Sequence, residues 1–242
     1  MMKCLLVTAT AASVLALGLG AAQAADLVPE PVVVAPAVFN WAGFYAGVHA
    51  GYAWGDQDDN QSILFDDAPL PADSFNVDGF IGGVHGGYNW QMDQFVFGVE
   101  GDIDYTNIKG SEGYAGFVPG FGDIEGNLEL KSQWQASARL RAGYAFDNFL
   151  VYATGGIAFA DGKLTSSGYN FDAPGNFSSD DSNTHVGWTI GAGAEYAFSP
   201  NWIARAELRY TDFGSKTYQL LEGPVDASWD QTSVTVGLSY KF

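Results

Sequence analysis

The stretch from Phe95 to Thr106 reads Phe-Val-Phe-Gly-Val-Glu-Gly-Asp-Ile-Asp-Tyr-Thr. Its odd positions are apolar or small, whereas the even positions from residue 100 onward are Glu, Asp, Asp and Thr. Successive side chains of a β-strand point to opposite faces. The stretch therefore predicts a strand with one apolar face and one charged face.

Seven other segments share this period of two, and long and short links alternate between them without exception. The eight segments are 41–54, 78–91, 94–106, 129–146, 149–160, 184–198, 202–214 and 230–242. Long and short links alternate when one end of an up-and-down sheet is open and the other is confined, and an even number of strands returns both termini to one end. We therefore predict an all-β fold: an eight-stranded antiparallel up-and-down transmembrane β-barrel with long external loops and short periplasmic turns. Segment 149–160 is apolar on both faces, so its register stays open.

The first 24 residues have the pattern of a secretory signal. A short basic start is followed by an apolar run and by Ala22-Gln23-Ala24, which predicts cleavage between Ala24 and Ala25. Three prolines in residues 25–40 predict an extended periplasmic segment, and residues 41–242 then form the barrel domain. The only cysteine is Cys4, so the mature chain has no disulfide.

The mature chain is strongly acidic. Nine basic residues stand against 28 acidic ones after Ala24, a formal net charge of −19. Nucleic-acid binding relies on Lys and Arg to neutralise phosphates, so this balance predicts no nucleic-acid partner.

A secreted β-sandwich or a lipocalin-like barrel would show a similar alternation, with its charged face in water. Two features favour a membrane barrel instead. The apolar face is rich in Ala and Gly beside aromatic residues, which suits contact with lipid chains. Aromatic residues also flank the short links, as with Tyr88 and Trp90, Tyr144 and Phe146. Such rings at one level are typical of an interfacial girdle.

Several motifs resemble the small eight-stranded outer-membrane proteins of alphaproteobacteria, a family of porin-like or opacity-like surface antigens that includes some haemin-binding members. They are Trp41-Ala-Gly-Phe-Tyr-Ala-Gly47, the segment 186–198, Ser199-Pro-Asn-Trp202 and Arg209-Tyr-Thr-Asp-Phe-Gly214. The resemblance implies a Gram-negative outer-membrane location with extracellular loops and periplasmic termini. It implies outer-membrane lipid and lipopolysaccharide as partners, and a host or haemin ligand at the loops. It also implies that the barrel-assembly machinery recognises the terminal strand, through Leu238, Tyr240 and Phe242.

We predict no enzyme, no metal site and no cofactor. Asp181, Ser182 and His185 lack a nucleophile elbow, and the acidic run from Asp56 to Asp67 lacks the glycine of a calcium loop. His49, His85 and His185 fall on the inner face, and an eight-stranded bore is filled by side chains. We expect hydrogen-bonded lumen histidines, with His185 near the mouth as a weak haemin ligand candidate.

Charged residues on the inner face are the most informative polar group. They are Glu100, Asp102, Arg139, Arg141, Glu195, Arg205, Glu207 and Arg209, with Asp104, Lys131 and Lys241 also assigned there. They could line a pore or form an internal ion-pair plug between adjacent strands, and the narrow bore favours the plug. The leading hypothesis is a structural and surface-interaction role in the envelope. Haemin binding comes second and a narrow diffusion pore third.

Overall fold

The computed structural model describes residues 39–59, 74–118, 122–220 and 223–242. Residues 1–38, which include the predicted signal peptide and most of the proline-rich segment, lie outside the described residues. The described residues form eight strands: β1 (Gly43–Asp59), β2 (Ser74–Met92), β3 (Phe95–Val118), β4 (Gly122–Phe146), β5 (Phe149–Asn170), β6 (Gly175–Ala197), β7 (Trp202–Leu220) and β8 (Gly223–Lys241). Among the described residues, no helix is long and apolar enough to cross a membrane.

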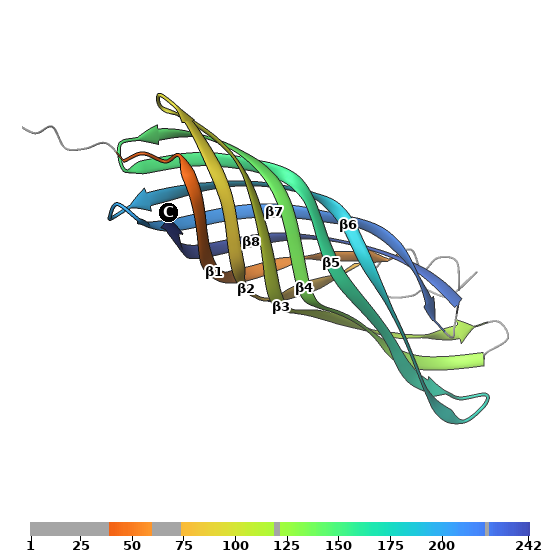
Figure 1. Ribbon diagram of the computed structural model, residues 1–242. Helices are drawn as coiled ribbons and strands as arrows, with labels where there is room; N and C mark the ends of the chain where they lie inside the picture. Colours follow the sequence, from red (N-terminus) through yellow and green to blue (C-terminus); the bar gives the residue numbers. More distant parts are fainter. Residues whose placement is uncertain (1–38, 60–73, 119–121, 221–222) are drawn as a thin grey trace, which may run out of the picture. The chain divides into compact units, whose positions relative to one another are not determined.

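Each strand pairs antiparallel with the next, and β8 pairs with β1 to close the barrel (Figure 1). Closure runs from the Tyr45–Lys241 pair to the Asp59–Ala227 pair, and Phe242 N–H donates to the Phe44 carbonyl at 3.0 Å. Closing the sheet removes both edges, so every strand within the barrel has a partner on each side. The predicted all-β, eight-stranded up-and-down barrel is confirmed.

The short links lie together at one end of the barrel, which we call the turn end; the other end is the loop end. Asp93 and Asp147 begin two-residue turns with φ of 53°. This left-handed conformation suits hairpin turns, and Asp adopts it more readily than most residues. In the third turn, Ser199 Oγ accepts from Trp202 N–H at 3.0 Å.

The strands continue well beyond the predicted segments at the loop end. The β3–β4 pairing reaches Val118–Gly122, and the β5–β6 pairing reaches Asn170–Gly175. Most of the predicted links 107–128 and 161–183 are therefore β-hairpins rather than irregular loops. In the β5–β6 hairpin both faces carry polar residues, as in 165–167 and 178–183, so the period of two does not reveal those strand ends. Residues 122–130 of β4 do alternate apolar and polar side chains, and the predicted segment began too late at residue 129.

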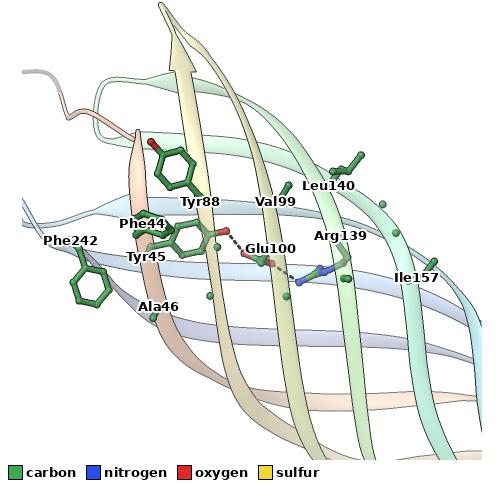
Figure 2. A pocket seen from close by; sticks show the side chains of 16 residues that line it. Phe44, Tyr45, Ala46, Tyr88, Val99, Glu100, Arg139, Leu140, Ile157 and Phe242 are labelled. Carbon is green, nitrogen blue, oxygen red and sulfur yellow. Dashed lines mark hydrogen bonds and ion pairs between the residues drawn. The ribbon is translucent and has the colours of Figure 1, made fainter.

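Outward-facing side chains form an apolar belt between two aromatic levels. On β3, Tyr105 lies ten positions after Phe95, and both rings are exposed. At about 3.3 Å per residue and a tilt of roughly 40°, this distance gives a belt about 25 Å tall, which matches the apolar band of an outer-membrane barrel. Figure 2 shows the two faces of the wall: the Val99, Leu140 and Ile157 side chains are exposed outside, whereas Glu100 and Arg139 meet inside.

A β-bulge in β4 corrects one sequence assignment. Gln133 and Trp134 are consecutive and both exposed, and both of their N–H groups donate to Asp161 Oδ1 at 2.8 Å. The bulge reverses the facing of the residues before it, so Lys131 points outward rather than into the lumen. The open register of segment 149–160 is also fixed: Leu150, Tyr152 and Thr154 point inward.

Candidate functional site: the charged lumen

Three layers of inward-facing side chains fill the barrel. An apolar cluster at the turn end consists of Trp41, Val96, Ala145, Leu150, Tyr152, Ala197 and Ile203. A second apolar cluster at the loop end consists of Ala53, Val77, Ile81, Ile108, Leu128, Leu130, Ala158, Ala160, Leu164, Phe213, Tyr218 and Trp229. The charged residues lie between these two apolar layers.

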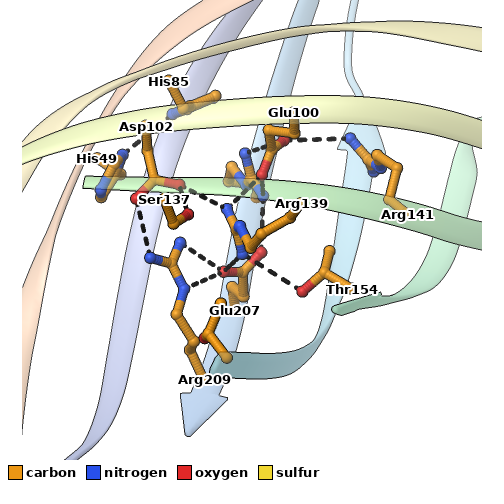
Figure 3. A network of polar contacts seen from close by, with 12 residues as sticks. His49, His85, Glu100, Asp102, Ser137, Arg139, Arg141, Thr154, Glu207 and Arg209 are labelled. Carbon is orange, nitrogen blue, oxygen red and sulfur yellow. Dashed lines mark hydrogen bonds and ion pairs between the residues drawn. The ribbon is translucent and has the colours of Figure 1, made fainter. Parts of the chain in front are cut away.

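Glu100 and Glu207 are the centres of the charged layer (Figure 3). Glu100 accepts from Arg205 Nη1 at 2.9 Å, from Arg139 Nη2 and from Tyr45 Oη at 2.7 Å. Glu207 accepts from Arg139 Nη1 at 2.6 Å, Arg205 Nη2 at 2.8 Å and Arg209 Nε at 3.0 Å, and from Tyr152 Oη at 2.9 Å. Arg139 thus links the two glutamates.

The remaining carboxylates complete the network. Asp102 accepts from Arg209 Nη1 at 2.9 Å and from Ser137 Oγ, and Glu195 lies 3.0 Å from Arg141 Nη2. No side chain in these pairs is more than 10% exposed. Burial strengthens these attractions, and it makes an unpaired charge costly.

The structure brings all eight charged residues of the predicted lumen set into one network. Glu100 of β3 and Arg139 of β4 are direct register partners and form an ion pair, as expected for opposite charges on adjacent strands. Several other contacts instead cross the lumen, such as Arg205 of β7 with Glu100 of β3. Glu195 of β6 and Arg205 of β7 are direct register partners, and Glu195 Oε1 lies 3.8 Å from Arg205 Nε. Lys241 shares the inward face of its register partner Tyr45, but it lies at the turn end, where its ammonium is 5.6 Å from the Phe39 ring centre, rather than in the charged network.

Sequence reasoning missed a chain of close polar contacts beside this network. Ser239 Oγ lies 2.7 Å from His85 Nε2, His85 Nδ1 lies 3.1 Å from His49 Nδ1, and His49 Nε2 lies 2.6 Å from Asp104 Oδ1. All four side chains are buried, so a substrate could not reach Ser239 without opening the barrel.

His185 lies in the loop-end apolar cluster. Its Nε2 is 2.6 Å from Tyr218 Oη, its ring stacks on Trp229, and the residue is 2% exposed. Burial raises the pKa of the Tyr218 phenol, which keeps this hydroxyl protonated. Ligation of haemin by His185 Nε2 would require displacing Tyr218 and unpacking the cluster. Among the described residues there is also no group of three or more His, Cys, Asp or Glu side chains placed to hold a metal ion.

A closed barrel with a belt of this height and a plugged, charged interior defines an outer-membrane β-barrel protein. Residues 12–242 match the family described as outer membrane protein beta-barrel domain, and the chain belongs to this family. It is 35% identical over 217 residues to the 25 kDa outer-membrane immunogenic protein of Brucella abortus, covering 89% of this chain and 85% of that protein. It is 36% identical over 247 residues to the 31 kDa outer-membrane immunogenic protein of Brucella melitensis, covering 96% and 98% of the two chains.

A solved structure agrees with the fold. The outer-membrane protein OprG from Pseudomonas aeruginosa aligns with a TM-score of 0.51 at 14% identity, covering 83% of this chain and 96% of that one. The sequence-based prediction of an alphaproteobacterial small outer-membrane barrel is therefore confirmed, as is the outer-membrane location. These two relatives are named as outer-membrane immunogenic proteins rather than as enzymes.

Proposed function

We propose that this protein is a non-conducting barrel that reinforces the outer membrane and holds its long hairpins at the cell surface. The observation that carries the proposal is the filled lumen. The ion network, whose side chains are at most 10% exposed, lies between the apolar cluster at the turn end and the apolar cluster at the loop end. Permeating ions would have to separate these pairs and enter two apolar layers, and both steps are costly.

A polar bridge supports the same conclusion. Gln135 of β4 and Gln231 of β8 exchange two amide hydrogen bonds across the lumen, at 3.0 and 2.8 Å. Strands four apart in an eight-stranded barrel lie on opposite walls, so this pair spans the bore between the ion network and the loop-end cluster. A diffusion pore would need an open, water-filled path at this level, and the paired amides occupy it.

Single-channel recording tests the closed barrel. Purified protein in planar bilayers should give no steady currents above the empty-bilayer level, with a porin prepared in the same detergent as the positive control. Large and steady currents from the wild-type protein would reject the closed barrel and favour the diffusion pore.

A deletion strain tests the envelope role. Loss of the gene should increase sensitivity to detergents and uptake of apolar dyes, and the wild-type gene should restore the barrier. A variant with residues 114–126 replaced by a two-residue turn keeps the Gly113–Asn127 register pair and removes the outer half of the β3–β4 hairpin outside the belt. It should restore the barrier while losing any surface interaction made by that hairpin. Unchanged barrier function in the deletion strain would reject the envelope role.

A further inference from the structure

Three lysines form a row on the outer surface of the barrel. Lys109 of β3 is the direct register partner of Lys131 of β4, which is the direct partner of Lys163 of β5. Direct partners on antiparallel strands have Cβ atoms about 5 Å apart, and like charges in such positions destabilise the sheet. The mature chain has only five lysines, so three of them stand in one unfavourable row.

The row lies just beyond the aromatic level at the loop end. Lys109 is four residues past Tyr105, and Lys131 is three residues from Trp134 across the bulge. At about 3.3 Å per residue and a tilt of roughly 40°, the row stands about 10 Å above the aromatic rings. Aromatic girdles lie at the headgroup boundary, so flexible lysine side chains from this row can reach the headgroup phosphates.

The local hydrogen bonds hold the row in place but leave its charges exchangeable. The bulge clamped by Asp161 is what turns Lys131 outward. Lys131 pairs with Glu129 at 2.7 Å and Lys163 with Asp180 at 2.9 Å, in pairs whose side chains are 31–55% exposed. Exposed pairs contribute only about 0–1 kcal/mol, so a phosphate can replace these carboxylates.

Lys109 has no ion pair among the described residues. Its register partner Asp78 accepts a hydrogen bond from Tyr52 Oη instead. The outward faces of the same strands carry the apolar belt below, so a lipid whose phosphates meet the lysines has a surface for its acyl chains.

We propose that Lys109, Lys131 and Lys163 bind the phosphate groups of a phosphorylated lipid in the outer leaflet. The site allows an acidic protein to hold anionic lipid that its net charge would otherwise repel. The inference is independent of whether the lumen conducts, so the bilayer recordings neither support nor weaken it.

The test compares two double variants that remove equal charge. Lys109→Gln/Lys131→Gln alters the row, and Lys216→Gln/Lys241→Gln alters two lysines outside it. Binding of bisphosphorylated lipid A to each purified protein in detergent is measured by titration. A basic side chain near an anionic surface contributes roughly fivefold in affinity, so the row variant should bind about 25-fold more weakly and the control within about twofold of wild type.

Further arms identify the source of the phosphate and guard against misfolding. Dephosphorylated lipid A should bind wild type and row variant equally weakly. Lys109→Arg/Lys131→Arg keeps the charge and should restore binding. Equal affinity of wild type and row variant for bisphosphorylated lipid A would overturn the proposal, as would an equal loss in the control. Inorganic phosphate or a sulfated oligosaccharide binding as tightly as the lipid would overturn the lipid assignment.

Discussion

Glu207→Ala is the substitution that most directly tests the lumen plug. Glu207 is the shared acceptor for the side chains of Arg139, Arg205, Arg209 and Tyr152. Its removal leaves three guanidinium groups close together in a buried layer without their common counter-charge. We expect a marked loss of stability in the isolated barrel.

The expected size follows from competing effects. Hydrogen bonds to charged groups contribute about 1.5–3 kcal/mol each, so a simple sum over the contacts of Glu207 would be far larger than any plausible result. The sum overestimates because Arg139 and Arg209 also contact Asp102, and Arg205 also contacts Glu100. We therefore expect the typical loss for a broken buried ion pair, about 3–5 kcal/mol, which corresponds to at least a hundredfold change in the folding equilibrium.

Glu129→Ala provides the matched control, because it removes a glutamate from a pair exposed to solvent. Glu129 and Lys131 have side chains that are 31% and 42% exposed, so the loss should stay below about 1 kcal/mol. Urea titration in detergent, followed by tryptophan fluorescence, measures both variants. Glu207→Ala should still conduct little, since both apolar clusters remain. Equal midpoints for Glu207→Ala and wild type, together with large wild-type currents, would refute the plug.

Three other predictions concern the ends of the chain and His185. Envelope-purified protein should begin at Ala25, and N-terminal sequencing that finds an intact Met1 would contradict this. Phe242→Ala should lower the amount of heat-modifiable barrel in cells while barely changing stability after refolding in detergent, because the side chain is 73% exposed and its backbone bond to Phe44 remains; normal cellular levels would argue against a terminal assembly signal. His185→Ala should lower the free energy of unfolding by about 2 kcal/mol or more through the cavity it leaves. Titration with haemin, followed by absorbance, should not distinguish it from wild type, and a loss of haemin binding in the variant would restore His185 as a ligand.

The alternation of side chains was enough to predict the strands that cross the belt and the facing of the lumen charges. In β3, Glu100 and Asp102 alternate with Val99, Gly101 and Ile103, so a register error of one residue would bury the belt and expose the charges. The alternation could not reveal which charges meet. Arg205 contacts Glu100 because the shear of the closed barrel brings β7 and β3 together across the lumen, and this depends on all the strand registers at once.

Two other features lay beyond the sequence pattern for local reasons. The alternation of side chains predicted that His49 and His85 point inward. It could not predict their contacts with each other and with Ser239 and Asp104, because these contacts join four strands. The alternation also predicted the wrong face for Lys131, because one bulge in β4 reverses the facing of every residue on its loop-end side. Bulges depend on a local backbone clamp, here the Asp161 carboxylate, that the period of two does not encode.

The two kinds of basic residue are separated in this chain, and the separation supports both proposals. All four arginines belong to the lumen network, and none of the five lysines in the described part of the chain does. Arg139 shows the reason, since its planar guanidinium contacts Glu100, Asp102 and Glu207 at once, which a single ammonium group could not do with the same fixed geometry. An ammonium group is strongly hydrated and sits on a flexible stem, which suits a wet surface where partners exchange. Arginine in the lumen therefore fits a permanent plug, and lysine in the outer row fits a reversible contact with lipid phosphates.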